Sequence, residues 1–265
     1  MRHFKCFGVA LLVLLAVPGV CWAQNALIVQ DGTAGIEADA MGNLTTKLTA
    51  AGYTVTNNVG VPGGSLAGYG QIWDIRFNNT TPLSGPDVTA YTTYLAGGGS
   101  LFVMGENTGF ATRNSSIVAL IGALGGGSVT ATNPASNTQT VLLPFTGPNA
   151  VSTVAFLAAA AIPAPPGSGR NITVDASGFA AAVVYSPGSL ASAPAGALIV
   201  VFDVNFLQAA ADADSQAFSN NLIAYLAAPV PLAGNSAIPT LSFWGMVLLA
   251  AAVVAIGVIF LARRL

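Results

Sequence analysis

Histidine and cysteine are almost missing from this chain of 265 residues. It has one histidine, His3, and two cysteines, Cys6 and Cys21, and all three lie near the amino terminus. Ser-His-Asp and Cys-His catalysis, zinc sites built from His and Cys, and His- or Cys-ligated haem and iron-sulfur clusters all need these side chains. If residues 1–23 are removed, the remaining chain has no His or Cys, so these kinds of site and disulfides are excluded. The hydrophobic core alone must then stabilise the folded protein. Roughly 200 residues are enough for that.

Charged residues are scarce as well, at 7% of the chain. Four of the eight basic residues lie within five residues of a terminus, so the interior holds four basic and ten acidic residues, a net charge of −6. Nucleic-acid binders neutralise phosphates with clustered Lys and Arg, and we therefore predict no nucleic-acid partner. The hydrophobic content of 53% also excludes a disordered polyelectrolyte.

The amino-terminal segment has the three parts of a secretory signal peptide. Residues 1–5 are basic, residues 7–20 are apolar, and small residues, Cys21 and Ala23, precede Gln24. The pattern predicts export by the secretion machinery, with signal peptidase cutting between Ala23 and Gln24. A retained anchor is the alternative, but the apolar run is short for a full span. Lipidation of Cys21 is disfavoured because Val20 is not a small residue.

The other end of the chain has a long uncharged stretch. Residues 243–262 carry no charge and are followed by Arg263 and Arg264. Twenty helical residues at about 1.5 Å each cross a hydrocarbon core of about 30 Å. The positive-inside rule then leaves the last residue in the cytoplasm and the main domain outside. We predict a transmembrane helix in the inner membrane, with a buried core helix as the alternative.

A short motif leads into this stretch, with the sequence Ile-Pro-Thr-Leu-Ser-Phe-Trp-Gly at residues 238–245. Together with the apolar stretch and the two arginines, it resembles the IPTL-CTERM sorting signal, a tail that exosortase-type membrane proteases process in Gram-negative bacteria. The resemblance implies that residues 238–265 are a temporary tether. It is cut near Pro239 and Thr240, within the four-residue motif that runs from Ile238 to Leu241. The domain would then be released or attached to a surface polymer.

Between the two ends, residues 24–229 alternate apolar runs with segments of helical spacing, and residues 230–237 are expected to form a linker. Alternating strands and helices predict a mostly parallel sheet that is covered on both faces. The expected strands are 26–30, 53–56, 71–77, 101–104 and 196–204, with antiparallel strands at 140–143, 172–175 and 181–185. The expected helices are 37–51, 84–97, 116–124 and 215–228, and 158–169 is expected to be irregular.

Two segments of this domain carry a second resemblance. Residues 97–107, Gly-Gly-Gly-Ser-Leu-Phe-Val-Met-Gly-Glu-Asn, and residues 201–207 followed by 220–226 are similar to the class I glutamine amidotransferase-like superfamily, a flavodoxin-like, doubly wound fold. Glu106 stands where the amidotransferases have their catalytic Cys. The resemblance therefore implies an α/β domain of this kind whose amidotransferase chemistry is absent, as in the ThuA-like and gliding-protein-like relatives.

Polar residues at the ends of the predicted strands are the candidate ligand-binding site. Ligands of open α/β sheets bind outside the carboxyl ends of the strands, where the sequence has Asp31, Arg76, Glu106 and Asp203. Such a group could hold a hard cation, bind sugar hydroxyls, or hydrolyse a glycoside through paired carboxylates. The alternative is that Asp31 and Asp203 cap turns while Glu106 pairs with Arg76 or Arg113.

Two functions remain open at this point. The first is a non-enzymatic exported protein, held in the inner membrane with its domain in the periplasm and later placed at the cell surface or outside the cell. The second is a hydrolase or lyase that acts on an extracellular polysaccharide through Glu106 and Asp203. We expect no cofactor, metal or catalytic residue, and extracellular polysaccharide is a candidate partner. Carboxylates in an open cleft would favour the enzyme, and burial against an arginine would favour binding or structure.

Overall fold

The computed structural model describes residues 24–32 and 35–227. The predicted signal peptide, the linker at 230–237, the sorting tail at 238–265 and its transmembrane helix at 243–262 lie outside these residues. Within the described part of the chain, none of the helices combines the length and the apolar composition that crossing a bilayer requires.

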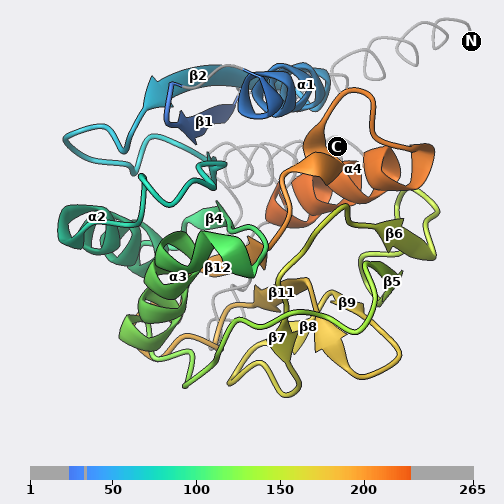
Figure 1. The fold of residues 1–265 in the computed structure, drawn as a ribbon. Helices are drawn as coiled ribbons and strands as arrows, with labels where there is room; N and C mark the ends of the chain where they lie inside the picture. Colours follow the sequence, from blue (N-terminus) through green and yellow to red (C-terminus); the bar gives the residue numbers. More distant parts are fainter. Residues whose placement is uncertain (1–23, 33–34, 228–265) are drawn as a thin grey trace, which may run out of the picture. The chain divides into compact units, whose positions relative to one another are not determined.

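A seven-stranded sheet forms the centre of the domain (Figure 1), with the order β2-β1-β3-β4-β12-β11-β8. The first five of these strands are parallel, and β11 and β8 are antiparallel additions at one edge. The parallel part has the order 2-1-3-4-5 of flavodoxin-like sheets. The predicted α/β class with a mostly parallel sheet is confirmed. The strands are β1 (Gln24–Gln30), β2 (Tyr53–Val59), β3 (Gln71–Asp74), β4 (Ser100–Met104), β8 (Arg170–Asn171), β11 (Ala182–Tyr185) and β12 (Ala197–Val201).

Both faces of the sheet are buried because alternate residues of each parallel strand enter different cores. In β1, Ala26 and Ile28 belong to one core, and Leu27 and Val29 belong to the other. Helices α1 (Ile36–Ala50) and α4 (Ala213–Ala227) cover the first face, while α2 (Gly85–Ala96) and α3 (Ala111–Ala123) cover the second and lie side by side in Figure 1. Strands covered on both faces have the continuous apolar runs that the sequence shows.

The chain between α3 and β12 departs from the repeated strand-helix pattern. It forms a three-stranded antiparallel sheet of β5 (Thr138–Val141), β6 (Thr153–Ala155) and β9 (Thr173–Val174), and a short pair of β7 (Ile162–Pro163) with β10 (Phe179–Ala180). Phe145 and Phe156 of this part pack into the core with α4, where Phe156 meets Phe218 edge to face. The antiparallel character predicted for this part is confirmed, although the span 158–169 holds β7 and is not wholly irregular.

Several element boundaries differ from the expected ones: β12 ends at Val201 and not at 204, and β2 continues to Val59. In β3 and α3, side chains end or begin the element. Strand β3 ends at Asp74, not at Phe77, because the Asp74 carboxylate accepts the N–H of Arg76 at 3.2 Å. Helix α3 begins at Ala111, five residues before the expected Ser116, because Asn79 accepts the N–H of Thr112 at 3.0 Å. This cap comes from a distant loop, so local sequence patterns do not reveal it.

Gly105 allows the chain to turn sharply after β4. A Cβ atom at this position would lie 2.6 Å from the Phe202 ring and 2.7 Å from Oδ1 of Asn114. Asn114 itself accepts the N–H of Glu106 at 3.0 Å and donates to its carbonyl at 2.7 Å, so α3 holds the turn in place. Close packing at Gly105 therefore determines where Glu106 lies.

We expect Gly105→Ala to lower the free energy of unfolding by about 1–3 kcal/mol, because the added methyl group overlaps two buried side chains. Chemical denaturation of the purified protein measures this. Gly42→Ala is the matched control: it lies within α1, nothing lies within 4 Å of the added atom, and a gain of about 0.5–1 kcal/mol is expected. Equal effects of the two substitutions would contradict the packing argument.

Candidate functional site

The four residues predicted from the strand ends all lie at the carboxyl edge of the parallel sheet. Asp31 follows β1 directly, and Arg76, Glu106 and Asp203 each stand two residues after β3, β4 and β12. The structure does not join them into one site. Arg76 belongs to an ion cluster beneath the edge near β3, and Glu106 and Asp203 form a separate pair at the ends of β4 and β12.

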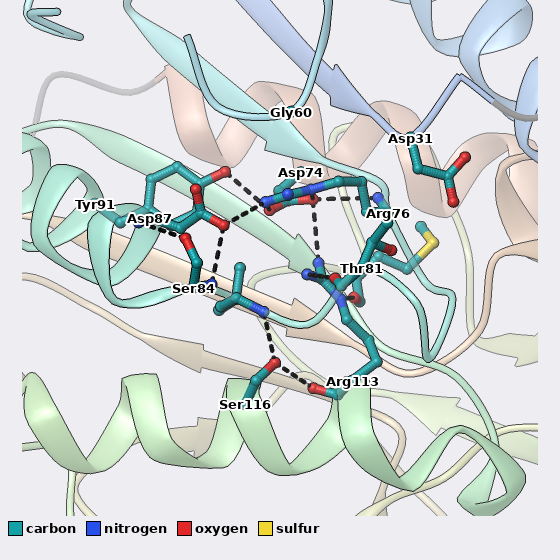
Figure 2. Close-up of polar contacts among 12 residues, drawn as sticks. Asp31, Gly60, Asp74, Arg76, Thr81, Ser84, Asp87, Tyr91, Arg113 and Ser116 are labelled. Carbon is teal, nitrogen blue, oxygen red and sulfur yellow. Dashed lines mark hydrogen bonds and ion pairs between the residues drawn. The ribbon is translucent and has the colours of Figure 1, made fainter. Parts of the chain in front are cut away.

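Asp74 is the centre of the ion cluster (Figure 2). Its carboxylate accepts from Arg76 at 2.7 and 3.0 Å, from Arg113 at 3.1 Å, and from the Tyr91 hydroxyl at 2.8 Å. Asp74 and Arg113 are fully buried, and Arg76 is nearly so. A second carboxylate, Asp87, approaches Arg76 at 3.4 Å, so the two positive charges are matched by two negative ones.

The cluster connects three elements that are far apart in the sequence. Asp74 ends β3, Tyr91 comes from α2 and Arg113 comes from α3. Asp87 also forms a capping box with Ser84 at the start of α2. The loop between β3 and α2 is held from the other side by Arg113, which donates to the Thr81 carbonyl at 3.0 Å.

The pKa of Asp74 shows which effect is larger in this cluster. Burial alone would raise it, but the charges of Arg113 and Arg76 and the hydrogen bonds from Arg76 and Tyr91 hold the pKa of Asp74 below its ordinary value. Burial and the neighbouring Asp74 charge raise the pKa of Tyr91 well above its ordinary value. The cluster therefore contains an ionised Asp74 and a neutral Tyr91 that keeps its proton.

Asp31 lies on the β1 side of this cluster (Figure 2). Its N–H donates to Oε1 of Glu37 at 3.0 Å, and Glu37 is a buried residue in the first turn of α1. Glu37 thus ties the end of β1 to the start of α1. Its burial was not expected from the sequence, in which it reads as an ordinary acidic residue at a helix start.

Glu106 and Asp203 lie buried beside each other, with 5% and 0% of each residue exposed. Asp203 accepts from the N–H of Asn205 at 2.6 Å and from the N–H of Ala158 at 3.2 Å. Oε1 of Glu106 is buried and has no hydrogen-bond partner among the described residues. The alternative in which Glu106 pairs with Arg76 or Arg113 is wrong, because both guanidinium groups donate to Asp74.

Burial and the charge of Asp203 raise the pKa of Glu106 to about 8, although backbone N–H groups of Val204 and Asn107 oppose the shift. Burial also raises the pKa of Asp203, against several backbone N–H groups. At neutral pH Glu106 therefore carries a proton. The pair can donate a proton from Glu106 or hold a hydrogen-bonding ligand, but it is not the open pair of carboxylates that a glycosidase cleft would present.

Two important residues, Asp74 and Arg113, were not predicted as site residues. Asp74 closes an otherwise apolar strand, Gln-Ile-Trp-Asp, in which all four residues are buried. A charged residue at the last position of such a run is a signal for a buried ion pair, because burying a lone charge is costly. Nothing in the local pattern identifies Arg113, which is 39 residues away from Asp74, as its partner.

We expect Asp74→Asn to lower the free energy of unfolding by about 3–5 kcal/mol, because it leaves two buried guanidinium groups without their central counter-charge. Tyr91→Phe removes one hydrogen bond of the same carboxylate and should cost about 1 kcal/mol. Urea denaturation at pH 7 measures both. Because the folded-state pKa of Asp74 is depressed, its contribution is full above about pH 4 and is lost as the pH falls further. Near-equal losses in the two variants would contradict the central role of Asp74.

The pH dependence should be opposite at Glu106. Its ordinary pKa of about 4.3 rises to about 8 on folding, so the folded chain binds more protons between these values and stability falls as the pH rises from about 4.5 to 8. Glu106→Gln removes this dependence and should make the protein on the order of 3 kcal/mol more stable at pH 8, with little change near pH 4. Denaturation midpoints from pH 4 to 8.5 check this, with the exposed Asp214→Asn as control. An unchanged profile in Glu106→Gln would show that Glu106 titrates normally.

Known proteins resemble this chain in two separate parts. The domain is similar to the solved mmIFT52 N-terminal domain, with a TM-score of 0.55 and 12% identity over 77% of this chain and 98% of that chain. It is also similar to a ThuA-like protein from Bacteroides uniformis, with a TM-score of 0.52 and 14% identity over 77% and 91%. Such low identities show a common fold alone. No curated protein matches. Residues 236–264 match the IPTL-CTERM motif, which confirms the predicted sorting signal at the end of the chain.

Proposed function

We propose that this chain is an exported protein that its sorting tail holds for processing, and that its α/β domain then binds or organises material at the cell surface or outside the cell. The observation that carries the proposal is the IPTL-CTERM motif at residues 236–264. The signal-like residues 1–23 agree with it, since export precedes sorting.

The tail acts as a substrate in this proposal. Residues 243–262 span the inner membrane, Arg263 and Arg264 stay in the cytoplasm, and an exosortase-type protease cuts near Pro239 and Thr240. Pro239 supports this reading physically, because proline keeps the chain out of a helix and leaves the residue before it extended. An extended segment is the form of a peptide that a protease can bind.

The domain is non-catalytic in this proposal. The fold shared with a ThuA-like protein fits an amidotransferase-like domain, and Glu106 stands at the position where the amidotransferases have a nucleophilic Cys. Residues 24–265 hold neither His nor Cys that could activate a substrate. What such a fold retains is its usual ligand-binding place, the carboxyl edge of the sheet.

One observation keeps the second candidate, a polysaccharide hydrolase or lyase. The pKa of Glu106 is raised to about 8 beside Asp203, and glycosidases pair a protonated carboxyl group with an ionised one. Against it, both carboxylates are buried, with 5% and 0% of each residue exposed. Release of reducing sugar by the wild type and its loss in Glu106→Gln would favour the enzyme over the binding protein.

Intact-mass analysis of the protein from its host, with and without the sorting protease, tests the proposal. We expect a species that begins at Gln24 and ends near Pro239 only when the protease is present. Pro239→Ala combined with Thr240→Ala should abolish that species, whereas Asn235→Ala in the linker should leave it unchanged. A species that keeps Arg263 and Arg264 in both strains would instead identify a permanently anchored membrane protein.

A further inference from the structure

A pocket of about 290 Å³ lies beside the Glu106–Asp203 pair at the carboxyl edge of the sheet. Asn107, which follows Glu106 in the chain, lines it, and so does Ala158, whose N–H donates to Asp203. Its volume is near the lower end of the range of about 300–1,000 Å³ for small-molecule sites, so it suits one small unit of a ligand. The other lining residues come from two segments, 133–137 and 158–159.

Buried carboxylates hold both segments in place. Asp175, with 6% exposed, accepts the N–H groups of Ala135 at 2.6 Å and Ser136 at 3.2 Å. Asn137 donates to the Leu157 carbonyl at 3.1 Å and so joins the two segments. The pocket is therefore formed before any ligand arrives, which lowers the entropic cost of binding.

Two amide side chains in the pocket have their oxygen atoms occupied and their NH₂ groups available. Oδ1 of Asn107 accepts the N–H of Gly109 at 2.8 Å, and Oδ1 of Asn133 accepts the hydroxyl of Thr108 at 2.8 Å. Neither Nδ2 atom has a hydrogen-bond partner among residues 24–32 and 35–227. Because each oxygen fixes the orientation of its amide, the pocket presents two oriented donors.

In Glu106, the residue before Asn107, Oε1 is a buried carboxyl oxygen without a hydrogen-bond partner among the described residues. Buried polar atoms are normally satisfied, and an orphaned one calls for a partner such as a ligand or an ordered water. Glu106 precedes Asn107 in the chain and does not line the pocket itself, so the polar groups that a ligand with several hydroxyl groups meets there are the amide side chains.

The lining excludes other classes of ligand by its chemistry. None of its eight residues is charged, so phosphates, uronates and amino acids would lose their water without forming an ion pair. None is aromatic, so nucleobases would find no stacking partner. The lining consists of proline and alanine, which can contact C–H groups, beside one serine and three amides, which hydrogen-bond hydroxyl groups.

We propose that this pocket binds a single unit of a neutral saccharide, through the amides of Asn107 and Asn133. The proposal rests on the proposed function, because an exported binding domain meets extracellular polysaccharide. It adds the place of binding and the charge of the ligand.

The test uses the full-length chain in detergent on an array of immobilised neutral oligosaccharides, with uronate-containing and sulfated oligosaccharides as charged counterparts. We expect at least one neutral oligosaccharide to bind. Ala158→Trp fills the pocket from an exposed position and should abolish binding, while Ala123→Trp, on the exposed side of α3, should leave it unchanged. Asn133→Asp keeps the acceptor for Thr108 and removes the donors, and should weaken binding about fivefold. Thermal unfolding of each variant checks that it is folded.

Three outcomes would overturn the proposal: no neutral oligosaccharide binds, only charged ones bind, or folded Ala158→Trp binds as well as the wild type. The mass analysis of the tail separates this failure from that of the proposed function. If the chain is exported and cut but binds no neutral oligosaccharide, the pocket proposal alone is wrong. If the tail is never cut and yet the pocket binds a sugar, the sorting proposal alone is wrong.

Discussion

The carboxylate of Asp74 is the interaction on which the carboxyl edge of the sheet depends. It gathers Arg76, Tyr91 and Arg113 onto the end of β3, and through them positions the starts of α2 and α3. Taking such charges out of water is costly, so a cluster of this kind persists only when its hydrogen bonds are well formed. The crevice next to β1 and β3, where flavodoxin-like sheets bind ligands, is therefore bordered by the protein's own ion cluster.

Two buried acidic groups at the same edge have pKa values shifted in opposite directions, although burial raises both. Asp74 has guanidinium partners and stays ionised, whereas Glu106 has another carboxylate beside it and keeps its proton. The difference comes from the neighbours and not from depth, since both side chains are nearly or wholly buried. The acidic group of this edge that keeps a proton therefore lies at the ends of β4 and β12 and not at the end of β3.

The parallel core was predictable because its signals are local. Apolar runs such as Leu101–Met104 and the buried positions Ala40, Leu44 and Leu48 of α1 follow from spacing alone. The two-residue strands β7, β8 and β10 were not predictable, because two residues are too few to show the alternation of apolar and polar residues that indicates a strand. The strand ends correctly placed Glu106 and Asp203 at one edge, but the choice of Asp74 as the partner of Arg113 depends on tertiary packing. The pocket lined by Asn107 and Asn133 was not predicted either, since its lining comes from three separate segments of the chain.

The first and last described residues of the domain lie close together. Gln24 and Ala227, the first and last described residues, line a common pocket of about 660 Å³ together with Tyr53 at the start of β2. The chain therefore enters and leaves the domain at the amino edge of the sheet. Seven strand residues at about 3.3 Å each separate that edge from the strand ends. A force on the backbone at Ala227 would therefore act on α4 and the amino edge, and the Glu106–Asp203 pair lies at the opposite end of the strands.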